Sequence, residues 1–508
     1  MRATVWKLHQ WLGLITCVGM LMWGLSGISH PIMSRLQPKP AAFMPPAITW
    51  DASQAANPQS WLKSLGINTL DSLHTVKLGD AVLWLAHPRL DQAGLLIDPR
   101  TGVVTPDGEP QLAQALARHY TGLMDARGAP VAQTRLITAF NEDYLPVNRL
   151  LPVWQVTFDR PDHLSAYIDT RQMRLATLND DTKRSLGQLF RWGHNWSLLD
   201  AWPRLQVMAM TVALCCALLS AMSGLYFGWT MRASATRRLS ARPVSRWHRR
   251  LGLTVALTSL AFAFSGLFHL WTGALRTPAS HLVSLDRPVS TMTDQAWAGV
   301  GDTGLIGRVD WVADGAASAW WVQAAGQGAP KAQVAALAAA EHAEHAEHQT
   351  SPRPQAAKPR ARLIDAQGLS LPDGAKQLAI RVATQDTGWP AERITDVRLI
   401  TRFDGEYGFL NKRLPVWRMQ FDAPGTPRVY VELATGAIAA RVNNADAVEG
   451  WSFSVLHKWN IGNINKDLRD VLVALFALGN VVVACLGLTL FWRPTLGVSR
   501  GASSGQTH

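Results

Sequence analysis

The chain has 508 residues, a mean hydropathy of +0.01 and a formal net charge of +12 at pH 7. The near-zero hydropathy averages strongly apolar and strongly polar stretches, which excludes a uniformly soluble chain. The positive charge does not indicate a nucleic-acid partner, because much of the clustered Lys and Arg flanks the apolar stretches, as is typical of membrane topology.

Four apolar stretches are long enough to form membrane helices. They cover residues 11–32, 205–231, 251–271 and 471–492. Each is nearly free of charged residues and can cross a hydrocarbon core of about 30 Å as a helix. A cleaved signal peptide is an alternative for the first stretch, but a second copy of it inside the chain favours a retained anchor. The sequence therefore predicts an α-helical bundle of four transmembrane helices.

The basic residues predict how these helices are oriented. The segment between the second and third helices has no acidic residue and contains Arg232, Arg237, Arg238, Arg242, Arg246, Arg249 and Arg250. Short loops rich in Lys and Arg remain in the cytoplasm, so we expect this loop and both termini to be cytoplasmic. The expected division is a first helix at 1–33, a periplasmic domain at 34–204, a second helix at 205–231, a cytoplasmic loop at 232–250, a third helix at 251–272, a second periplasmic domain at 273–467, a fourth helix at 468–493 and a cytoplasmic tail at 494–508.

The two long polar regions have the patterns of mixed α and β domains. The segments 151–159 and 414–422 alternate apolar and polar residues and are rich in aromatics, which is typical of half-buried strands. Each precedes a segment that suits a partner strand across a turn. Residues 81–104 indicate a further hairpin, and residues 111–122 a helix. Short antiparallel sheets with a packed helix are therefore expected in two extracytoplasmic α+β domains.

The chain contains an internal repeat, which predicts a duplicated architecture. LHQWLGL near the start matches WHRRLGL, and GLSGISH matches AFSGLFH, both at an offset of 239 residues. Farther along, LPVW recurs at an offset of 263 residues, as does the pair FRWGHNW and FSVLHKW. The larger offset indicates an insertion in the second copy, at about 324–362. Its histidines His342, His345 and His348 fit a solvated low-complexity linker, and we assign them no site.

Three histidines occur at matched positions in both copies and carry the functional prediction. His9 matches His248, His30 matches His269, and His194 matches His457. The 21 residues between His9 and His30 span roughly 31 Å of helix, so one histidine lies near each membrane face. The same interval turns the second ring only about 60° around the helix axis, so both can face the bundle interior.

Opposed imidazoles between apolar helices suit the two axial positions of a haem iron. His9 and His248 are expected to meet at the cytoplasmic face. His30, His194, His269 and His457 are expected near the outer face, where crosswise pairs or the symmetric pair could ligate a second haem. Lone interfacial histidines bonded to the backbone or to lipid are the plainer interpretation, but matched placement in both copies favours haem.

Other chemistry finds little support in the chain. There is no phosphate-binding loop, dinucleotide fingerprint, HExxH zinc motif or convincing nucleophile elbow, so no catalytic residue is assigned. The matched segments FNEDY from Phe140 and FDGEY from Phe403 suit either a ligand pocket or hairpin turns.

Across nearly its whole length the chain resembles the PepSY-associated transmembrane family. The resemblance is carried by LHQWLGL with a following SG and His, by the PVW strand, by the downstream HxW and by the four-helix plan. Within that family it resembles bacterial inner-membrane siderophore reductases. The resemblance implies two haems b that pass electrons to ferric iron held by a periplasmic siderophore, releasing ferrous iron for uptake.

The sequence has no nucleotide or flavin motif, so electrons are expected from a separate donor, either a quinol or a reductase. Ferric siderophore, that donor and membrane lipid are the expected partners. Two other functions stay open at this point. One is a non-enzymatic sensor or regulator whose PepSY-like domains bind a periplasmic peptide or protease. The other is a metal or siderophore permease, which the lack of a charged intramembrane pathway makes weak.

Overall fold

The computed structural model covers the whole chain and describes residues 2–123, 129–230, 243–275, 286–314, 317–325, 361–462 and 464–492. The chain divides into two compact units that alternate along the sequence. A helix unit comprises Met1–Leu36, Ser185–Thr277 and Asp446–His508. A sheet unit comprises Gln37–Arg184 and Pro278–Ala445. The loop at 232–242, most of the insertion at 326–360, with its three histidines, and the tail at 493–508 lie outside the described residues.

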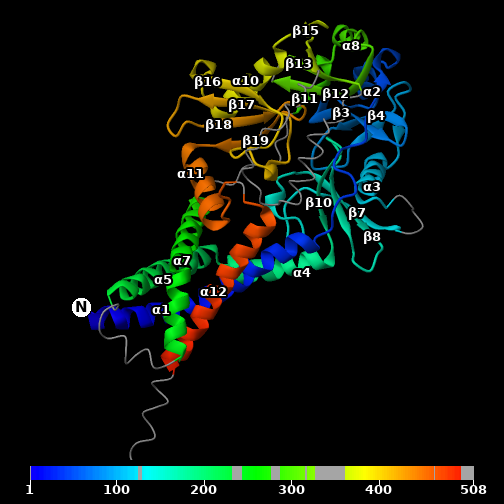
Figure 1. Cartoon of the computed structure of the whole chain (residues 1–508). Helices are drawn as coiled ribbons and strands as arrows, with labels where there is room; N and C mark the ends of the chain where they lie inside the picture. The colour runs from blue at the N-terminus through cyan, green and yellow to red at the C-terminus, as the bar shows by residue number, and fades with distance from the viewer. Residues whose placement is uncertain are drawn as a thin grey trace, which may run out of the picture. The chain divides into compact units, whose positions relative to one another are not determined.

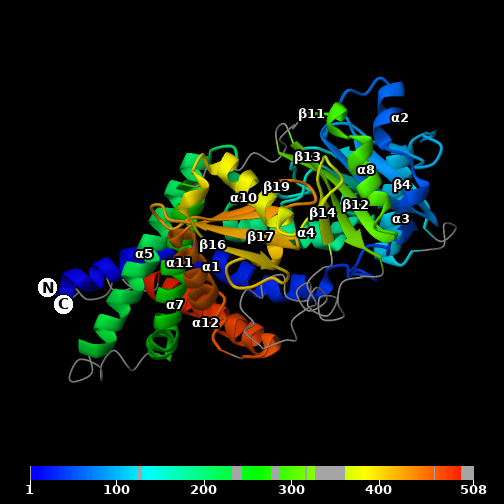
Figure 2. The ribbon, with the colours of Figure 1, turned by 90° about the horizontal axis from the view of Figure 1, so that it is seen from above.

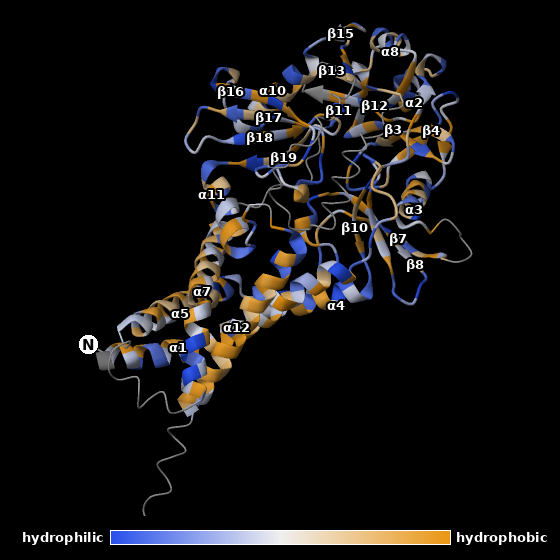
Figure 3. Ribbon diagram, viewed as in Figure 1, coloured by the Kyte–Doolittle hydropathy of each residue, from blue (hydrophilic) through white to orange (hydrophobic). Residues whose placement is uncertain are grey.

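The helix unit is built from four long helices (Figures 1 and 3). They are α1 (Arg2–Leu36), α5 (Pro203–Thr230), α7 (Pro243–Leu275) and α12 (Lys466–Trp492). Each is long and apolar enough to cross a membrane, which confirms the four predicted spans. The helices extend past the apolar stretches, because polar flanking residues can continue the helix beyond the hydrocarbon core.

The four helices pack side by side in a ring. α1 packs against α5 and α12, and α7 packs against the same two helices, so α1 and α7 occupy opposite corners. The buried positions are mostly small residues: Cys17, Ser26, Ala213, Cys216, Ser223, Ala256, Ala263, Ser265, Ala477 and Ala484. Small side chains let helix backbones approach closely where no hydrophobic effect drives association. Large apolar side chains such as Leu257 and Trp229 are exposed, as expected of a surface that faces lipid.

Two short segments lead into α5 and α12 in the same way. α4 (Asp181–Phe190) continues into a π-helical turn at Arg191–Asn195, and α11 (Asn444–Ser452) continues into one at Phe453–His457. Each is followed by a tryptophan with left-handed backbone, Trp196 at φ 55° and Trp459 at φ 53°. Single π-turns inside helices are rare and often occur at functional positions.

The sheet unit contains antiparallel sheets formed by short strands (Figure 1). The strands before α5 are β1 (Trp50–Asp51), β2 (Thr69–Leu70), β3 (Ser72–Leu78), β4 (Ala81–His87), β5 (Leu95–Ile97), β6 (Val104–Thr105), β7 (Val131–Ile137), β8 (Val153–Phe158), β9 (Ser165–Asp169) and β10 (Arg174–Asn179). Those after α7 are β11 (Arg287–Pro288), β12 (Leu305–Asp314), β13 (Ala317–Ala324), β14 (Ala361–Ile364), β15 (Ser370–Leu371), β16 (Ile394–Ile400), β17 (Val416–Phe421), β18 (Arg428–Glu432) and β19 (Ala437–Val442). The accompanying helices are α2 (Pro58–Ser64), α3 (Gly108–Thr121), α8 (Asp294–Gly301) and α10 (Gly374–Thr387).

The largest sheet combines strands from both halves of the chain. Its order is β15-β14-β13-β12-β3-β4-β5-β6, with β1 beside β12. The junction pairs β12 with β3, where Asp310 lies opposite His74 and Trp311 opposite Leu73. The two regions predicted as separate periplasmic domains thus form one compact unit, because this sheet takes strands from both of them.

Two four-stranded sheets have the same plan. One has the order β7-β8-β9-β10 and the other β16-β17-β18-β19, and each is a simple antiparallel meander. The predicted strand pairs are confirmed, with Trp154 opposite Ile168 in one sheet and Trp417 opposite Val431 in the other.

A helix packs on each four-stranded sheet, α3 on β8 and β9, and α10 on β17 and β18. Figure 2 shows α10 beside β17. α3 buries apolar residues at intervals of three and four positions, including Leu112, Leu116 and Tyr120, which is typical of an amphipathic helix. Both helices end at a glycine with positive φ, Gly122 and Gly388, whose N–H bonds the carbonyl four residues earlier.

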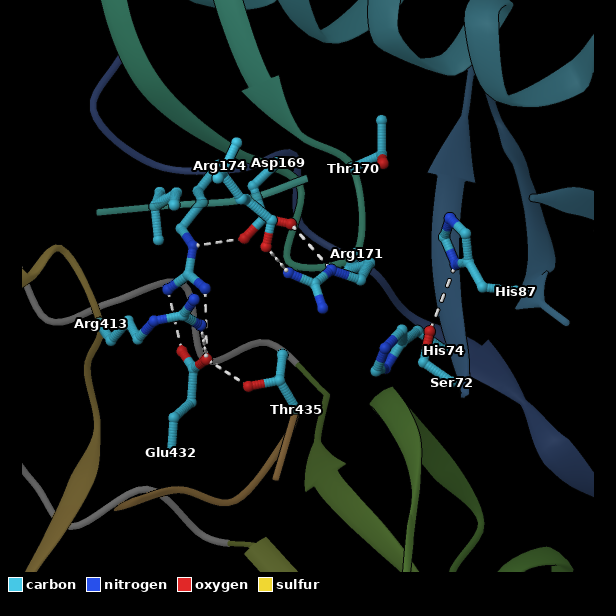
Figure 4. Close-up of polar contacts among 12 residues, drawn as sticks. Ser72, His74, His87, Asp169, Thr170, Arg171, Arg174, Arg413, Glu432 and Thr435 are labelled. Atoms are coloured by element: carbon cyan, nitrogen blue, oxygen red, sulfur yellow. Dashed lines mark hydrogen bonds and ion pairs between the residues drawn. The ribbon is translucent and has the colours of Figure 1, made fainter. Parts of the chain in front are cut away.

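The two four-stranded sheets meet through buried charges (Figure 4). Arg174 of β10 pairs with Asp169 at 2.9 Å and with Glu432 of β18, also at 2.9 Å. Arg413 also pairs with Glu432, at 2.5 Å. Because both carboxylates are almost fully buried, each depends on these guanidinium groups to offset its desolvation.

Candidate functional site

All six predicted histidines lie in the helix unit, in two groups. His9 on α1 and His248 on α7 lie near the helix ends that carry Lys7 and Arg249, here called the basic end. The other four lie toward the opposite end. They are His30 on α1, His269 on α7, His194 in the π-turn before α5 and His457 in the π-turn before α12. The structure thus keeps the separation that the 21-residue spacing predicts.

At the basic end, each histidine forms a hydrogen bond through its Nδ1 atom. His9 Nδ1 lies 2.8 Å from the Ser223 hydroxyl, and that hydroxyl donates to the Ser220 carbonyl at 2.9 Å. The hydroxyl proton is therefore engaged, so His9 Nδ1–H is the donor. His248 Nδ1 lies 3.1 Å from the Val483 carbonyl, which can only accept. Both neutral rings therefore carry hydrogen on Nδ1 and keep a lone pair on Nε2.

A glycine stands beside each of these two rings. A Cβ atom on Gly224 of α5 would lie 3.5 Å from Cε1 of His9, and one on Gly487 of α12 would lie 3.3 Å from Cε1 of His248. The two glycines are 263 residues apart, the same offset that relates His194 and His457. Any larger side chain would project toward this edge of the imidazole, so glycine leaves the Cε1 edge of each ring uncrowded.

At the opposite end, His194 and His457 approach each other. Their ring centroids are 6.0 Å apart with planes at 87°. Their Nδ1 atoms lie 3.1 Å from the hydroxyls of Ser26 and Ser265, respectively. Each hydroxyl donates to a helix carbonyl one turn earlier, so each imidazole donates from Nδ1 and keeps a free lone pair on Nε2.

Burial favours the neutral form of this pair. Burial, and to a smaller extent the nearby His30 and His269, lower the pKa of His194 to about 4. Burial likewise lowers the pKa of His457 to about 3, with His194 and Lys458 acting in the same direction. Both rings are therefore uncharged at pH 7, which is the state of imidazole that ligates metal.

Aromatic rings link the four histidines at this end. The Phe190 ring lies between His30, at a centroid distance of 5.4 Å, and His194, at 4.7 Å. Phe453 has the same place in the second half. Its ring stacks on that of His269 at 4.4 Å and on that of His457 at 4.8 Å.

Two further pairs of stacked rings lie beside these histidines. Trp23 stacks on Trp196 at 5.3 Å, and Phe262 stacks on Trp459 at 5.6 Å. Together with the contacts of Phe190 and Phe453, these stacks hold the π-turns against α1 and α7.

Several of these groups were missed by the sequence analysis. Ser26 and Ser265 lie in the matched segments GLSGISH and AFSGLFH but had no predicted role, and neither had Ser223, Gly224 or Gly487. A signal existed for the glycines, since SGLYFGW and LGLTLFW match at the 263-residue offset. The carboxylate of Glu449, which lies 2.5 Å from Nδ1 of His269, has no such signal because its counterpart in the first half is Leu186.

The arrangement fits haem better than a bare metal ion. In the described part of the chain, no group of three or more His, Cys, Asp and Glu side chains is placed to hold a metal ion. A haem iron needs only two axial donors from the protein, since the porphyrin supplies the other four. Imidazoles anchored through Nδ1 have the tautomer that this ligation needs, and at the basic end glycine leaves the Cε1 edge of each ring uncrowded.

Four apolar helices and a sheet unit define an integral membrane protein with a large β-rich part. The family model of the PepSY-associated TM region matches residues 6–493, which is nearly the whole chain. The protein belongs to this family, as its histidine and PVW motifs predict. No curated protein matches the chain.

Proposed function

We propose that this protein is a di-haem b reductase that passes electrons across the bacterial inner membrane to ferric iron in a periplasmic siderophore. The observation that carries the proposal is the shared state of five imidazoles in the helix unit. His9, His248, His194, His457 and His269 each bond through Nδ1 and keep Nε2 for a ligand. Histidines with a purely structural role have no need of one tautomer at matched positions near both helix ends.

The histidines take different roles at the two ends of the bundle. His9 and His248 stand on opposite corners of the helix ring and would hold one haem at the basic end. The second haem would be held by two of His30, His194, His269 and His457. When bound, haem supplies reversible one-electron transfer, while the protein sets the potential through ligand identity and burial. The remaining two histidines would contact propionates or substrate.

The proposal includes the orientation and origin of the chain. The basic end would face the cytoplasm, because α5 ends and α7 begins there, on either side of the arginine-rich segment, and because α1 begins and α12 ends there. The sheet unit would then lie in the periplasm. We infer that the chain arose by internal duplication, which accounts for the repeated offsets of 239 and 263 residues and for the equal plan of the two four-stranded sheets.

Siderophore iron suits a reductase of this kind. Hard oxygen donors hold ferric iron tightly, and the gain of one electron converts it to ferrous iron, which such donors bind weakly. Each ferric ion reduced consumes one electron, so the protein needs a continuous external supply. A membrane quinol or a separate reductase would provide it at the basic end.

Optical spectra of the purified full-length protein test the proposal. Oxidised and dithionite-reduced spectra are recorded for wild type, His9→Ala, His248→Ala and the control His119→Ala, a histidine of the sheet unit that bonds the Met44 carbonyl at 2.8 Å. We expect b-type bands in wild type. His9→Ala and His248→Ala should each lose about half of the haem, and His119→Ala should lose none.

The substrate is tested separately on the reduced protein. Addition of a ferric trihydroxamate siderophore is expected to reoxidise the haem and to generate ferrous iron, which a chelator detects. A protein that carries no haem from cells with ample haem would refute the reductase. A peptide- or protease-binding regulator would then be the better proposal.

A further inference from the structure

His269 of the helix unit has a charged partner. Nδ1 of His269 lies 2.5 Å from Oε1 of Glu449, whereas the other four anchored rings bond hydroxyls or a backbone carbonyl. Glu449 lies in α11 with only 6% of its surface exposed. A buried carboxylate beside an imidazole makes a charge-assisted hydrogen bond, which is roughly twice as strong as a neutral one.

The surroundings of Glu449 fix this contact. Glu449 and Phe453 are four residues apart in the continuous segment formed by α11 and its π-turn, so both face the same side. Phe453 stacks on His269 at 4.4 Å with planes 24° apart, while the carboxylate holds the ring edge at Nδ1. These two contacts restrain the ring and leave Nε2 on the side away from the carboxylate.

The first half of the chain differs at this position. Phe190 corresponds to Phe453 and His30 to His269, but the residue that corresponds to Glu449 is Leu186. The carboxylate therefore breaks the equivalence of two otherwise similar sets of rings. The leucine side chain cannot accept a hydrogen bond, so the position that corresponds to Glu449 supplies no carboxylate in the first half.

We propose that Glu449 is a positioning residue that orients His269 for haem iron and lowers the reduction potential of the haem that His269 ligates. The inference rests on the proposed function. A carboxylate that accepts from Nδ1–H makes the imidazole a stronger donor through Nε2, which stabilises ferric iron over ferrous iron. The haem at the end opposite to the basic end is thereby the stronger reductant, as needed for ferric iron held tightly by its chelator.

The test measures the reduction potentials of both haems in the full-length protein. Redox titrations are followed at the b-type bands for wild type, Glu449→Gln, Glu449→Asp and Glu449→Leu. Gln keeps the shape without the charge, Asp keeps the charge, and Leu copies the first half. The control Asp467→Asn removes a charge from a side chain of the same unit that is 78% exposed.

We expect Glu449→Gln to weaken the preference for ferric iron about tenfold at one haem, which raises one potential by about 59 mV. The other potential stays unchanged, and Glu449→Asp stays near wild type. Glu449→Leu is expected to lower haem affinity at that position by about 10- to 100-fold. Asp467→Asn moves neither potential.

Four outcomes would overturn the proposal. The first two are unchanged potentials in Glu449→Gln and equal shifts of both potentials in that variant. The third is a shift confined to the haem that His9→Ala removes. The fourth is a loss of haem in Glu449→Gln that also occurs in Glu449→Asp. A restored haem with a wild-type potential in Glu449→Asp supports it. A wild-type protein without haem refutes the proposed function itself, which separates that failure from a failure of the role of Glu449.

Discussion

His87 of the sheet unit and four histidines of the helix unit differ in how their ring nitrogens are engaged. In the sheet unit, His87 is bonded on both sides, to Ser72 at 3.2 Å and to Glu109 at 2.9 Å. Glu109 also accepts from Thr170 at 2.6 Å and is almost fully buried. Both ring nitrogens of His87 have hydrogen-bond partners within the fold, so this network stabilises the sheet unit and leaves no ring nitrogen for a ligand.

In the helix unit, the hydrogen bonds described for four rings all involve Nδ1. The four are those of His9, His194, His248 and His457. The partner atoms are hydroxyls already engaged with helix carbonyls, or a carbonyl itself. The comparison teaches that burial of a histidine does not indicate function by itself. One-sided anchoring, repeated with the same tautomer at matched positions, does.

The largest loss of stability is expected at the buried ion pairs of the sheet unit. Glu432→Gln leaves Arg174 and Arg413 without their shared carboxylate, which should cost about 3–5 kcal/mol. Hydrogen exchange of peptides from β10 and β18 in the full-length protein measures the loss. The exposed residue Glu392 gives the control Glu392→Gln, expected to change exchange by less than about 0.5 kcal/mol. Equal effects of both variants would contradict the role assigned to the buried pairs.

The sheet unit should also be sensitive to acid through His74. Burial lowers the pKa of His74 to about 4, although the Asp310 carboxylate 2.7 Å away opposes this and Arg308 and Arg171 reinforce it. Between pH 6.5 and 4 the unfolded chain binds a proton that the folded unit does not, so stability falls as pH falls.

The expected loss for His74 is about 2 kcal/mol between pH 7 and pH 5. Exchange of peptides from β3 and β12, corrected for the intrinsic rate at each pH, measures it. His74→Gln removes the titrating group and should flatten the dependence by this amount. An unchanged slope in the variant would assign the acid sensitivity to other groups.

The space beside the helix-unit histidines provides a sharper test of one-sided anchoring. Gly487→Val places a branched side chain against His248, whose Cε1 lies 3.3 Å from the position of a new Cβ. Haem affinity at the basic end is expected to fall about tenfold or more, measured by transfer of haem to apomyoglobin. Gly13→Val is the control, since nothing lies within 4 Å of its new Cβ. Similar losses in both variants would mean that valine disturbs the helices in general.

The smallest effect is expected from the hydroxyl anchors. Ser26→Ala removes the acceptor of His194 Nδ1–H and should weaken haem binding by about 1 kcal/mol, which is about fivefold. Ser29→Ala on the same helix removes only a hydroxyl that donates to the Ser26 carbonyl, at 2.6 Å. A faster haem loss in Ser26→Ala than in Ser29→Ala supports one-sided anchoring. Equal rates would show that the tautomer of His194 does not depend on Ser26.

The local elements and the repeated residues follow from patterns along the chain. Apolar length predicts the four helices because a helix must span the hydrocarbon with its own backbone bonds satisfied. Alternation predicts the strands around Trp154 and Trp417, since successive side chains of a strand face opposite sides. The repeat identifies six histidines because two copies of one motif must place them at matched positions.

Which of these elements meet depends on the folded arrangement of the whole chain. No local pattern encodes the pairing of β3 with β12, because strand pairing depends on the path of the chain between them. The tautomers of the histidines follow from Ser223, Val483, Ser26 and Ser265, which are distant in sequence from the rings that they bond. The contact of Glu449 with His269 is of the same kind. Helix and strand periods are local properties, whereas the state of an imidazole depends on the atoms that folding brings next to it.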